Sequence, residues 1–366
     1  MNLELTDEQV ALRDTVRRYL AEKASVSGHV RPILDDPTGS TDAVWRGLVD
    51  LGTTSLLVPV EHGGDAMSMT EAGLVCEELG AALNPGPWLS SAVVAPRTLQ
   101  RFGADGEPAH DLFAGIADGS VVATVAVPPR HRATFSVDRR GDDVVFRGEI
   151  GEVPDAAAAD ILLAVAQDTL CAIPLASPDV RIEQIPGIDR SRKTFRVSLD
   201  HAAGRVVAVA GEHHVEAVEA LIDDMIVAWA ADALGAARQV LHMTVEYAKV
   251  RRQFGAPIGS FQAVAHLCVD MHETVELARS GVQYALWAAD TADRDERHLA
   301  ALRVKAFAGR LAAVGDVAIQ VFGGIGFTAE HDAQMYLKRL LSFSRLLGSP
   351  GHYLEQVGRR LTATTT

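Results

Sequence analysis

The sequence predicts an α+β protein in three parts: an N-terminal helical domain over residues 1–118, a middle antiparallel β domain over 119–211 and a C-terminal four-helix bundle over 212–366. Apolar residues recur at helical spacing in both outer parts, whereas short β-type runs crowd the middle without a helical period between them. Strands spaced this closely indicate an antiparallel sheet or barrel rather than βαβ units. A chain of 366 residues also exceeds one ordinary core, so two or three packed units are expected.

Three helices are predicted in the N-terminal domain. The first, Thr6–Lys23, begins with the Thr-Asp-Glu-Gln pattern of a capping box and continues with apolar residues at rough helical spacing. The second runs from Trp45 to a stop at Gly52, and the third covers Met69–Leu83. An Asn-Pro-Gly-Pro sequence follows the third helix and closes it.

The middle domain contains short runs of β-forming residues separated by turn residues such as those at 140–142. Two prolines follow the first run and stop it. The predicted strands are Val121–Val127, Thr134–Val137, Val144–Gly148, Ile161–Ala166, Ala172–Pro174, Val180–Ile185, Phe195–Leu199 and Val206–Ala210.

The C-terminal part is helical again, and its first helix is long and rich in alanine. Four long helices with short joints predict a bundle. They are Glu216–Val250, Phe261–Asp290, His298–Phe322 and Ala333–Leu347, followed by a terminal segment to Leu361.

Composition excludes several classes of protein. Lys and Arg number 34 against 48 Asp and Glu, and the resulting net charge of −14 argues against nucleic-acid and anionic-membrane binding. Cys76, Cys171 and Cys268 lie too far apart for a disulfide framework or a zinc site, and no metal site is expected. No uninterrupted run of eighteen apolar residues is present, and the first residues lack a signal peptide's features. We therefore expect a cytoplasmic protein that does not span a membrane.

One unusual segment, residues 247–262, places Arg251, Arg252 and Phe254 around a Gly-Pro break between two predicted helices. A planar guanidinium beside an aromatic face suits a pyrophosphate that carries an adenine. Taken alone, a helix–helix turn with two solvated arginines is the better explanation.

A second segment, Gln320–Phe327, is rich in glycine and follows a predicted helix. Glycines at a helix end let backbone N–H groups approach a phosphate or a ring edge. Taken alone, however, a helix C-cap and loop is the better explanation. Neither segment fits a Walker loop or a dinucleotide-binding glycine motif, because neither follows a strand.

Together and in this order, the two segments resemble the acyl-CoA dehydrogenase family of FAD enzymes. Leu57–Gly64 and Val153–Leu162 are similar to the family's N-terminal loop and β domain, so the resemblance covers nearly the whole chain. It implies that Arg251 binds the FAD pyrophosphate, that Phe254 flanks the adenine and that Gln262 lies near the same cofactor. Further residues implied to approach the adenosine half of FAD are Gln320, Gly323 and Gly324.

The resemblance also implies an activity and partners. Family members remove hydrogen from the α and β carbons of an acyl-CoA thioester, and the hydride passes to FAD. An electron-accepting flavoprotein is the expected acceptor downstream. In this family, the residues that correspond to those named above bind the FAD of a neighbouring subunit. The resemblance therefore implies an obligate oligomer.

The sequence departs from the family at the catalytic base, which is a glutamate at one of two alternative positions. Leu347 and Met225 stand at these positions, and neither accepts a proton. Asp224 is a candidate substitute, although it points to another side of the helix and is one methylene shorter than Glu. A solvated helix face is the alternative explanation of Asp224.

A second departure concerns the stretch expected to cradle the flavin ring. It corresponds to Val125–Arg132, where two prolines remove N–H donors and hydroxyl groups are missing. The chain thus retains residues that act across an interface and lacks those that act on its own flavin. It resembles the subunit without the base in α2β2 actinobacterial acyl-CoA dehydrogenases of the steroid side-chain type. A self-sufficient homo-oligomer with an atypical base, and a structural subunit that does not touch FAD, remain the alternatives.

Overall fold

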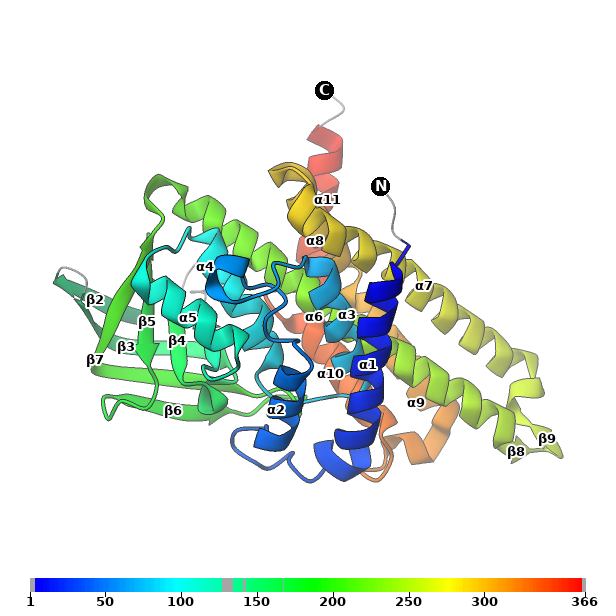
Figure 1. Ribbon diagram of the computed structural model, residues 1–366. Helices are drawn as coiled ribbons and strands as arrows, with labels where there is room; N and C mark the ends of the chain where they lie inside the picture. Colours follow the sequence, from blue (N-terminus) through cyan, green and yellow to red (C-terminus); the bar gives the residue numbers. More distant parts are fainter. Residues whose placement is uncertain (1–3, 127–133, 141–142, 167, 364–366) are drawn as a thin grey trace. The chain divides into compact units, whose positions relative to one another are not determined.

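The computed structural model describes residues 4–126, 134–140, 143–166 and 168–363 (Figure 1). Its α-helices are α1 (Asp7–Lys23), α2 (Asp42–Asp50), α3 (Met69–Ala81), α4 (Ala95–Arg101), α5 (Glu107–Ala117), α6 (His214–Val250), α7 (Gln262–Thr291), α8 (Arg294–Ala306), α9 (Ala308–Phe322), α10 (Ala333–Arg345) and α11 (Pro350–Ala363). Its strands are β1 (Ala123–Ala126), β2 (Thr134–Arg140), β3 (Asp143–Pro154), β4 (Ile161–Ala166), β5 (Thr169–Pro174), β6 (Val180–Ile185), β7 (Thr194–Val209), β8 (Arg252–Gln253) and β9 (Ala256–Pro257).

The α+β fold class is confirmed: helices precede and follow a run of strands. The chain forms two compact units that are interleaved in sequence. The helical unit comprises Met1–Val30, Gly73–Asn84 and Ile226–Thr366, and the sheet unit comprises Arg31–Ala72 and Pro85–Met225. The domain boundaries after residues 118 and 211 stay predictions.

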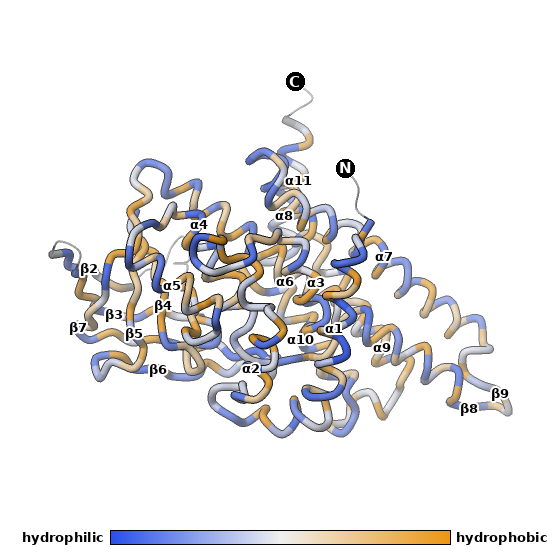
Figure 2. The backbone as a smooth tube through the Cα atoms, in the orientation of Figure 1, coloured by the Kyte–Doolittle hydropathy of each residue, from blue (hydrophilic) through white to orange (hydrophobic). Residues whose placement is uncertain are grey.

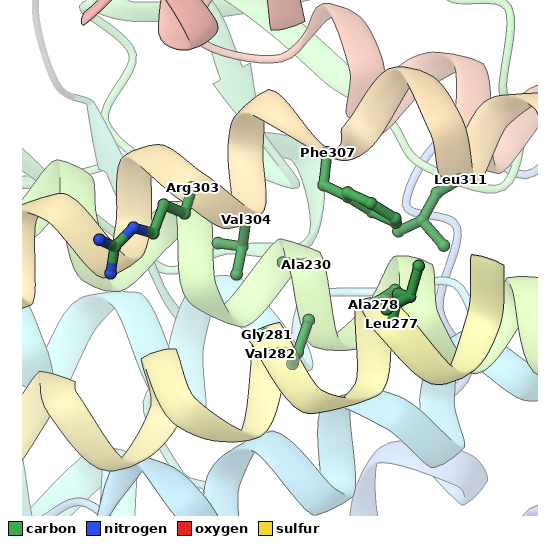
Figure 3. A pocket seen from close by; sticks show the side chains of 9 residues that line it. All are labelled: Ala230, Leu277, Ala278, Gly281, Val282, Arg303, Val304, Phe307 and Leu311. Carbon is green, nitrogen blue, oxygen red and sulfur yellow. The ribbon is translucent and has the colours of Figure 1, made fainter. Parts of the chain in front are cut away.

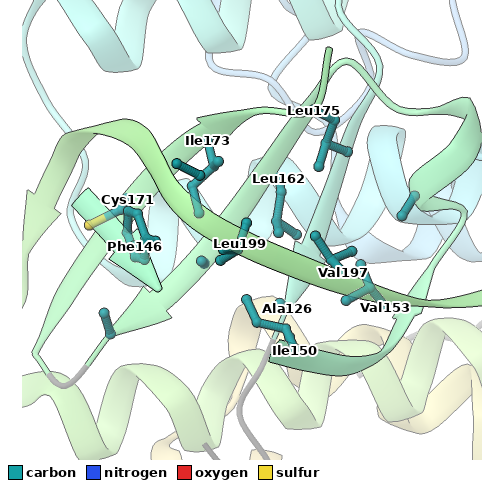
Figure 4. Packing of buried hydrophobic residues seen from close by; sticks show 14 of the residues in the cluster. Ala126, Phe146, Ile150, Val153, Leu162, Cys171, Ile173, Leu175, Val197 and Leu199 are labelled. Carbon is teal, nitrogen blue, oxygen red and sulfur yellow. The ribbon is translucent and has the colours of Figure 1, made fainter. Parts of the chain in front are cut away.

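The sheet unit contains one sheet of seven strands in the order β1-β4-β5-β7-β3-β2, with β6 also paired to β7. The strand pairs are antiparallel as predicted, except that β1 and β4 run parallel with Ala123 opposite Ile161. One face buries an apolar cluster that includes Phe146, Leu162 and Val197 (Figure 4). Cys171 lies in the same cluster, and burial raises the pKa of its thiol to about 11.

Strand β7 corrects a prediction, since the runs at 195–199 and 206–210 form one strand of 16 residues. The polar and small residues between them favour a turn by sequence, but they form a β-bulge instead. Arg147 pairs with Asp200 and Phe146 with Ala202, so His201 is the extra residue, with φ of 61°. A bulge lets the strand bend without ending.

The helical unit begins with α1, whose predicted capping box is present: Gln9 N–H donates to Thr6 Oγ1, and Thr6 N–H donates to Gln9 Oε1. The predicted helix at 298–322 is two helices, because a turn at Phe307 separates α8 from α9. Phe307 O accepts from the Arg310 N–H, a three-residue spacing tighter than the α-helical one. In Figure 2, hydrophilic and hydrophobic residues alternate along α7, as expected of a helix with one buried face.

Helices α3 and α6 approach each other through two glycines. A Cβ atom on Gly80 would lie 1.8 Å from the Asp232 carbonyl oxygen, and one on Gly235 would lie 1.8 Å from that of Glu77. The buried Arg339 of α10 then donates to both carboxylate oxygens of Asp232, at 2.9 and 3.0 Å. This part of the core is therefore fixed by close backbone packing and by an ion pair.

Among the described residues, the stretch Arg294–Phe327 has the length and apolar composition of a membrane-spanning helix, and half of its most apolar window is buried in the protein. Core helices of globular proteins meet the same criteria, so the finding is weak support for a membrane span.

Candidate cofactor-binding site

The segment after α6 folds into a hairpin that links α6 to α7 (Figure 1). Arg252 pairs with Pro257 and Gln253 with Ala256, which leaves Phe254 and Gly255 at the tip. Both tip residues have positive φ, 50° for Phe254 and 83° for Gly255. The left-handed region suits glycine and costs a residue such as Phe254 roughly 1 kcal/mol or more. The turn therefore holds an aromatic residue in an unfavourable backbone conformation.

The side chains of this hairpin face outward. Phe254 is 94% exposed and meets the Phe261 ring edge to face, with 6.2 Å between ring centroids. Arg252 donates to Gly255 O at 3.1 Å, so its guanidinium braces the turn. The exposed Arg251 guanidinium has no hydrogen-bond or ion-pair partner within the described part of the chain. It is the cation that remains available for an anion.

Two aromatic contacts connect this hairpin to the glycine-rich segment. The Tyr247 ring, one turn before Arg251, lies 4.8 Å from the Phe322 ring at the end of α9. Phe322 in turn packs against His331, at 4.3 Å between ring centroids. The two segments singled out from the sequence therefore lie at the same end of the helical unit.

The end of α9 is open on its backbone side. Gly323 ends the helix with φ of 64°, and a Cβ atom on Gly323 or Gly324 would meet nothing within 4 Å. Gln320, one turn earlier, is exposed, and so is Gln262 at the start of α7. The six predicted cofactor-binding residues are thus all at the surface, and their role toward FAD stays a prediction.

These groups suit the adenosine half of FAD. A pyrophosphate needs a cation whose donors are not already used, and Arg251 meets this condition within the described residues. An adenine needs an aromatic face, and a close approach needs backbone without side chains, as at Gly323 and Gly324. Because the side chains face outward, this part of the chain forms an exposed surface rather than an enclosed pocket.

Asp224 has surroundings that the sequence did not reveal. Its carboxylate is only 1% exposed and accepts hydrogen bonds from Arg97 (3.0 and 3.3 Å) and Arg101 (2.8 and 3.0 Å). The alternative of a solvated helix face is therefore wrong. Burial opposes the charged form, but the two guanidinium groups outweigh it and lower the pKa of Asp224. A general base needs an accessible oxygen and a raised pKa, so this arrangement disfavours Asp224 as the catalytic base.

The two positions implied for a catalytic glutamate have different surroundings. Met225 is buried, whereas Leu347 is 37% exposed and has φ of 56°. The Tyr353 hydroxyl donates to Leu347 O at 2.8 Å and holds this left-handed turn. Neither side chain is titratable. The stretch expected to cradle the flavin ring falls mostly on residues 127–133, outside the described residues.

Arg97 and Arg101 are the residues that sequence reasoning missed. They stand four positions apart on α4, directly after the apolar, buried segment Leu89–Val94. A charged residue in an apolar helical run usually pairs with an opposite charge. Two arginines after a buried apolar segment could therefore have indicated a buried carboxylate partner.

Fold and sequence place the chain in a known class. Residues 6–110 match the model of the acyl-CoA dehydrogenase N-terminal domain, and residues 216–362 match that of the C-terminal domain. The chain is 36% identical to acyl-CoA dehydrogenase FadE34 of Mycobacterium tuberculosis over 99% of its own length, but it spans only 48% of that protein. It is 31% identical to acyl-CoA dehydrogenase IpdE2 of Mycolicibacterium smegmatis, over 96% of this chain and 98% of IpdE2. The chain therefore belongs to the acyl-CoA dehydrogenase family.

Solved structures share the whole fold. The ChsE4-ChsE5 complex from Mycobacterium tuberculosis aligns with a TM-score of 0.87 and 24% identity, covering 99% of both chains. The Tcur3481-Tcur3483 steroid ACAD G363A variant aligns with a TM-score of 0.86 and 25% identity, covering 98% and 99%. A glutaryl-CoA dehydrogenase from Mycobacterium smegmatis in complex with FADH2 aligns at 0.86 and 17% identity, covering 98% and 95%.

Proposed function

We propose that this chain is the subunit without a catalytic base in a cytoplasmic, FAD-dependent α2β2 acyl-CoA dehydrogenase. In this proposal a homologous catalytic subunit holds most of the FAD and supplies the base. The present chain contributes Arg251, Phe254, Gln262, Gln320 and the backbone at Gly323–Gly324 to the FAD, mainly to its adenosine half. The carrying observation is that the cofactor-type residues face outward, while the base positions hold Leu347 and Met225.

Each residue has a physical role in this arrangement. Arg251 would hold the pyrophosphate through charge-assisted hydrogen bonds, and Arg252 keeps the hairpin in shape through Gly255 O. Phe254, already held at the hairpin tip, would contact the adenine without first being ordered. When bound, FAD supplies a hydride acceptor for desaturation of the acyl thioester. An electron-accepting flavoprotein would be the partner of this complex as electron acceptor.

The first experiment compares the chain purified alone with the chain co-expressed with a homologous acyl-CoA dehydrogenase encoded beside it. We expect stoichiometric flavin and desaturase turnover only in the co-purified complex. Stoichiometric flavin and turnover in the chain alone would refute the paired-subunit proposal and favour a self-sufficient homo-oligomer.

Arg251→Ala tests the cofactor contact within the complex. Losing a charge-assisted contact of about 1.5–3 kcal/mol should weaken flavin retention roughly 10- to 150-fold, measured as flavin absorbance per complex after dialysis. Arg181→Ala removes a comparably exposed arginine from β6 and should leave retention unchanged. If Arg251→Ala retains flavin like the unmodified complex, the chain is a structural subunit that does not touch FAD.

The substrate proposed is a CoA thioester with a steroid-derived side chain. The likeness to a solved steroid ACAD variant at 25% identity supports this class. To check this substrate class, we would compare turnover of the complex on two substrates. One is a steroid side-chain CoA thioester, and the other is a straight-chain acyl-CoA whose acyl chain is as long as the steroid side chain. A preference for the straight chain would argue for a fatty acyl substrate.

A further inference from the structure

The helical unit contains a hollow of about 160 Å³ that the proposed function does not use (Figure 3). Four helices form it: α6 contributes Ala230, α7 Gly281, α8 Val304 and α9 Leu311, and Phe307 of the α8–α9 turn also lines it. In Figure 3 the Phe307 and Leu311 side chains extend toward the α7 side of the hollow. Leu277 of α7, which also lines it, is 47% exposed and marks an open side.

The hollow exists because small residues coincide on facing helices. Ala230, Ala278 and Gly281 fill little space between α6 and α7. A Cβ atom on Gly281 would lie 3.7 Å from Val304 Cγ1, which is ordinary van der Waals contact, so the site has room for a larger side chain. The hollow is not a sealed void: with its open side at Leu277 it is an apolar pocket at the edge of the helical core.

The walls favour an apolar occupant over water. Of the nine described residues that line the hollow, Arg303 alone is charged. Its guanidinium pairs with Glu296 at 3.4 Å, and Glu296 also accepts from the Tyr284 hydroxyl at 2.6 Å. These polar groups therefore satisfy one another at the rim. A water molecule inside needs two to four polar partners, which alanine, glycine, valine, leucine and phenylalanine do not provide.

Size limits the occupant further. An apolar cavity of about 150 Å³ stays dry and binds benzene, whereas sites for drug-sized ligands measure about 300–1,000 Å³. An acyl-CoA or a fused ring system would have to extend out of this space through its open side at Leu277. We propose that the hollow between α6, α7 and the α8–α9 turn is a binding site for one compact, neutral, apolar molecule of about the size of benzene.

Thermal unfolding of the full chain with benzene as the probe tests this site. At ten times its Kd, a ligand bound only to the folded state lowers the unfolding equilibrium constant about 11-fold, which should raise Tm by about 2 °C. The shift should saturate with benzene concentration. A change in Tm that is absent, negative or linear in benzene would overturn the proposal.

Gly281→Leu fills the hollow, and Gly358→Leu is its matched control, since Gly358 lies in α11 with nothing within 4 Å of its Cβ position. Both variants replace a helical glycine by leucine, so their gain in helix propensity is similar. We expect Gly281→Leu to abolish the benzene shift and Gly358→Leu to retain it. An undiminished shift in Gly281→Leu would place benzene elsewhere and refute the site.

A structural readout covers the case in which Gly281→Leu does not fold. Crystals of the unmodified chain or complex under xenon pressure should show one xenon atom beside Phe307 and Gly281. Full xenon occupancy elsewhere with none in this hollow would contradict the proposal.

Discussion

At the scale of single residues, Asp224 shows how its surroundings set the chemistry of a side chain. From the sequence, Asp224 was a candidate base or a solvated carboxylate; the structure shows an anion shared by Arg97 and Arg101. These partners lie 127 and 123 residues away in the chain. Helical periodicity describes only neighbouring residues, so it could not predict this contact. The cofactor-type residues differ, because Arg251 and Phe254 stand within one local motif that sequence alone picks out.

Asp224→Asn should destabilise the fold strongly, because two guanidinium groups lose their shared carboxylate in a buried place. The expected fall in the free energy of unfolding is about 3–5 kcal/mol, measured by urea denaturation at pH 7. Asp200→Asn, at an exposed position in β7, should change it by less than about 0.5 kcal/mol. Equal effects of the two substitutions would show that the Arg97–Asp224–Arg101 cluster is not the stabilising anion site described above.

The contribution of the ionised Asp224 to the free energy of unfolding should also depend on pH in the acid range. Because its pKa in the folded state lies below the ordinary 3.8, its contribution is complete above that value and is lost as pH falls further. Between pH 4 and pH 2 the unmodified chain should therefore lose more stability than Asp224→Asn does. Parallel curves of the free energy of unfolding over this range would contradict the shift.

Lys305 should produce a pH dependence of the same sign, in the neutral to alkaline range. Its amine is fully buried, donates to Phe343 O and lies 4.6 Å from the Phe343 ring centroid, and burial lowers its pKa to about 7. Between pH 7 and about 10 the unfolded chain binds a proton that the folded chain does not. The free energy of unfolding should rise there by at most about 1.4 kcal/mol per pH unit.

Lys305→Met removes the titratable amine. The free energy of unfolding, measured by urea denaturation, should then change little between pH 7 and pH 9. Lys249→Met, at an exposed position in α6, keeps the buried amine and should keep the slope. A slope that survives in Lys305→Met would assign the pH dependence to another group.

At the scale of elements, local sequence signals located most helices and strands. The capping box placed the start of α1, and the runs at 161–166 and 180–185 match β4 and β6. Tertiary packing decided the rest. Strand pairing across the bulge at His201 keeps β7 continuous through residues that favour a turn by sequence, and the parallel partner of β1 is set by topology rather than by local pattern.

The contact between α3 and α6 should tolerate larger side chains less well than other contacts between elements do. Gly80→Ala places a methyl group where the Asp232 carbonyl oxygen would be 1.8 Å away, so the helices must separate. We expect a loss of about 1–3 kcal/mol or more in the free energy of unfolding, by analogy with overpacked cores. Gly358→Ala, in open space on α11, should instead stabilise by about 0.5–1 kcal/mol. A neutral Gly80→Ala would show that this crossing has room to spare.

At the scale of the whole molecule, the helical unit is assembled from three separate stretches of the chain. Glu78 of α3 binds both Arg17 of α1 and Arg238 of α6, and the Tyr336 hydroxyl donates to Ala81 O. The unit therefore depends on residues from the beginning, the first quarter and the end of the sequence.

A fragment of residues 212–366, the predicted C-terminal domain, tests this dependence. Without α1 and α3 it loses the partners of Arg238 and Tyr336, so we expect helical far-UV circular dichroism without a cooperative thermal transition. The full chain is the control. A sharp transition in the fragment would show that the segments from the first quarter are dispensable and would support the boundary after residue 211.

The interleaved helical unit also constrains how the protein is made. The Ala81 and Leu83 carbonyls receive donors from residues 255 and 256 positions later. At roughly 5–20 residues per second, ribosomes need about 13–50 s to synthesise the intervening chain. Throughout that interval α3 has emerged without α10, the helix that supplies these donors, and its core-facing side stays incompletely covered. We therefore expect the nascent chain to expose an apolar face of α3 for much of its synthesis.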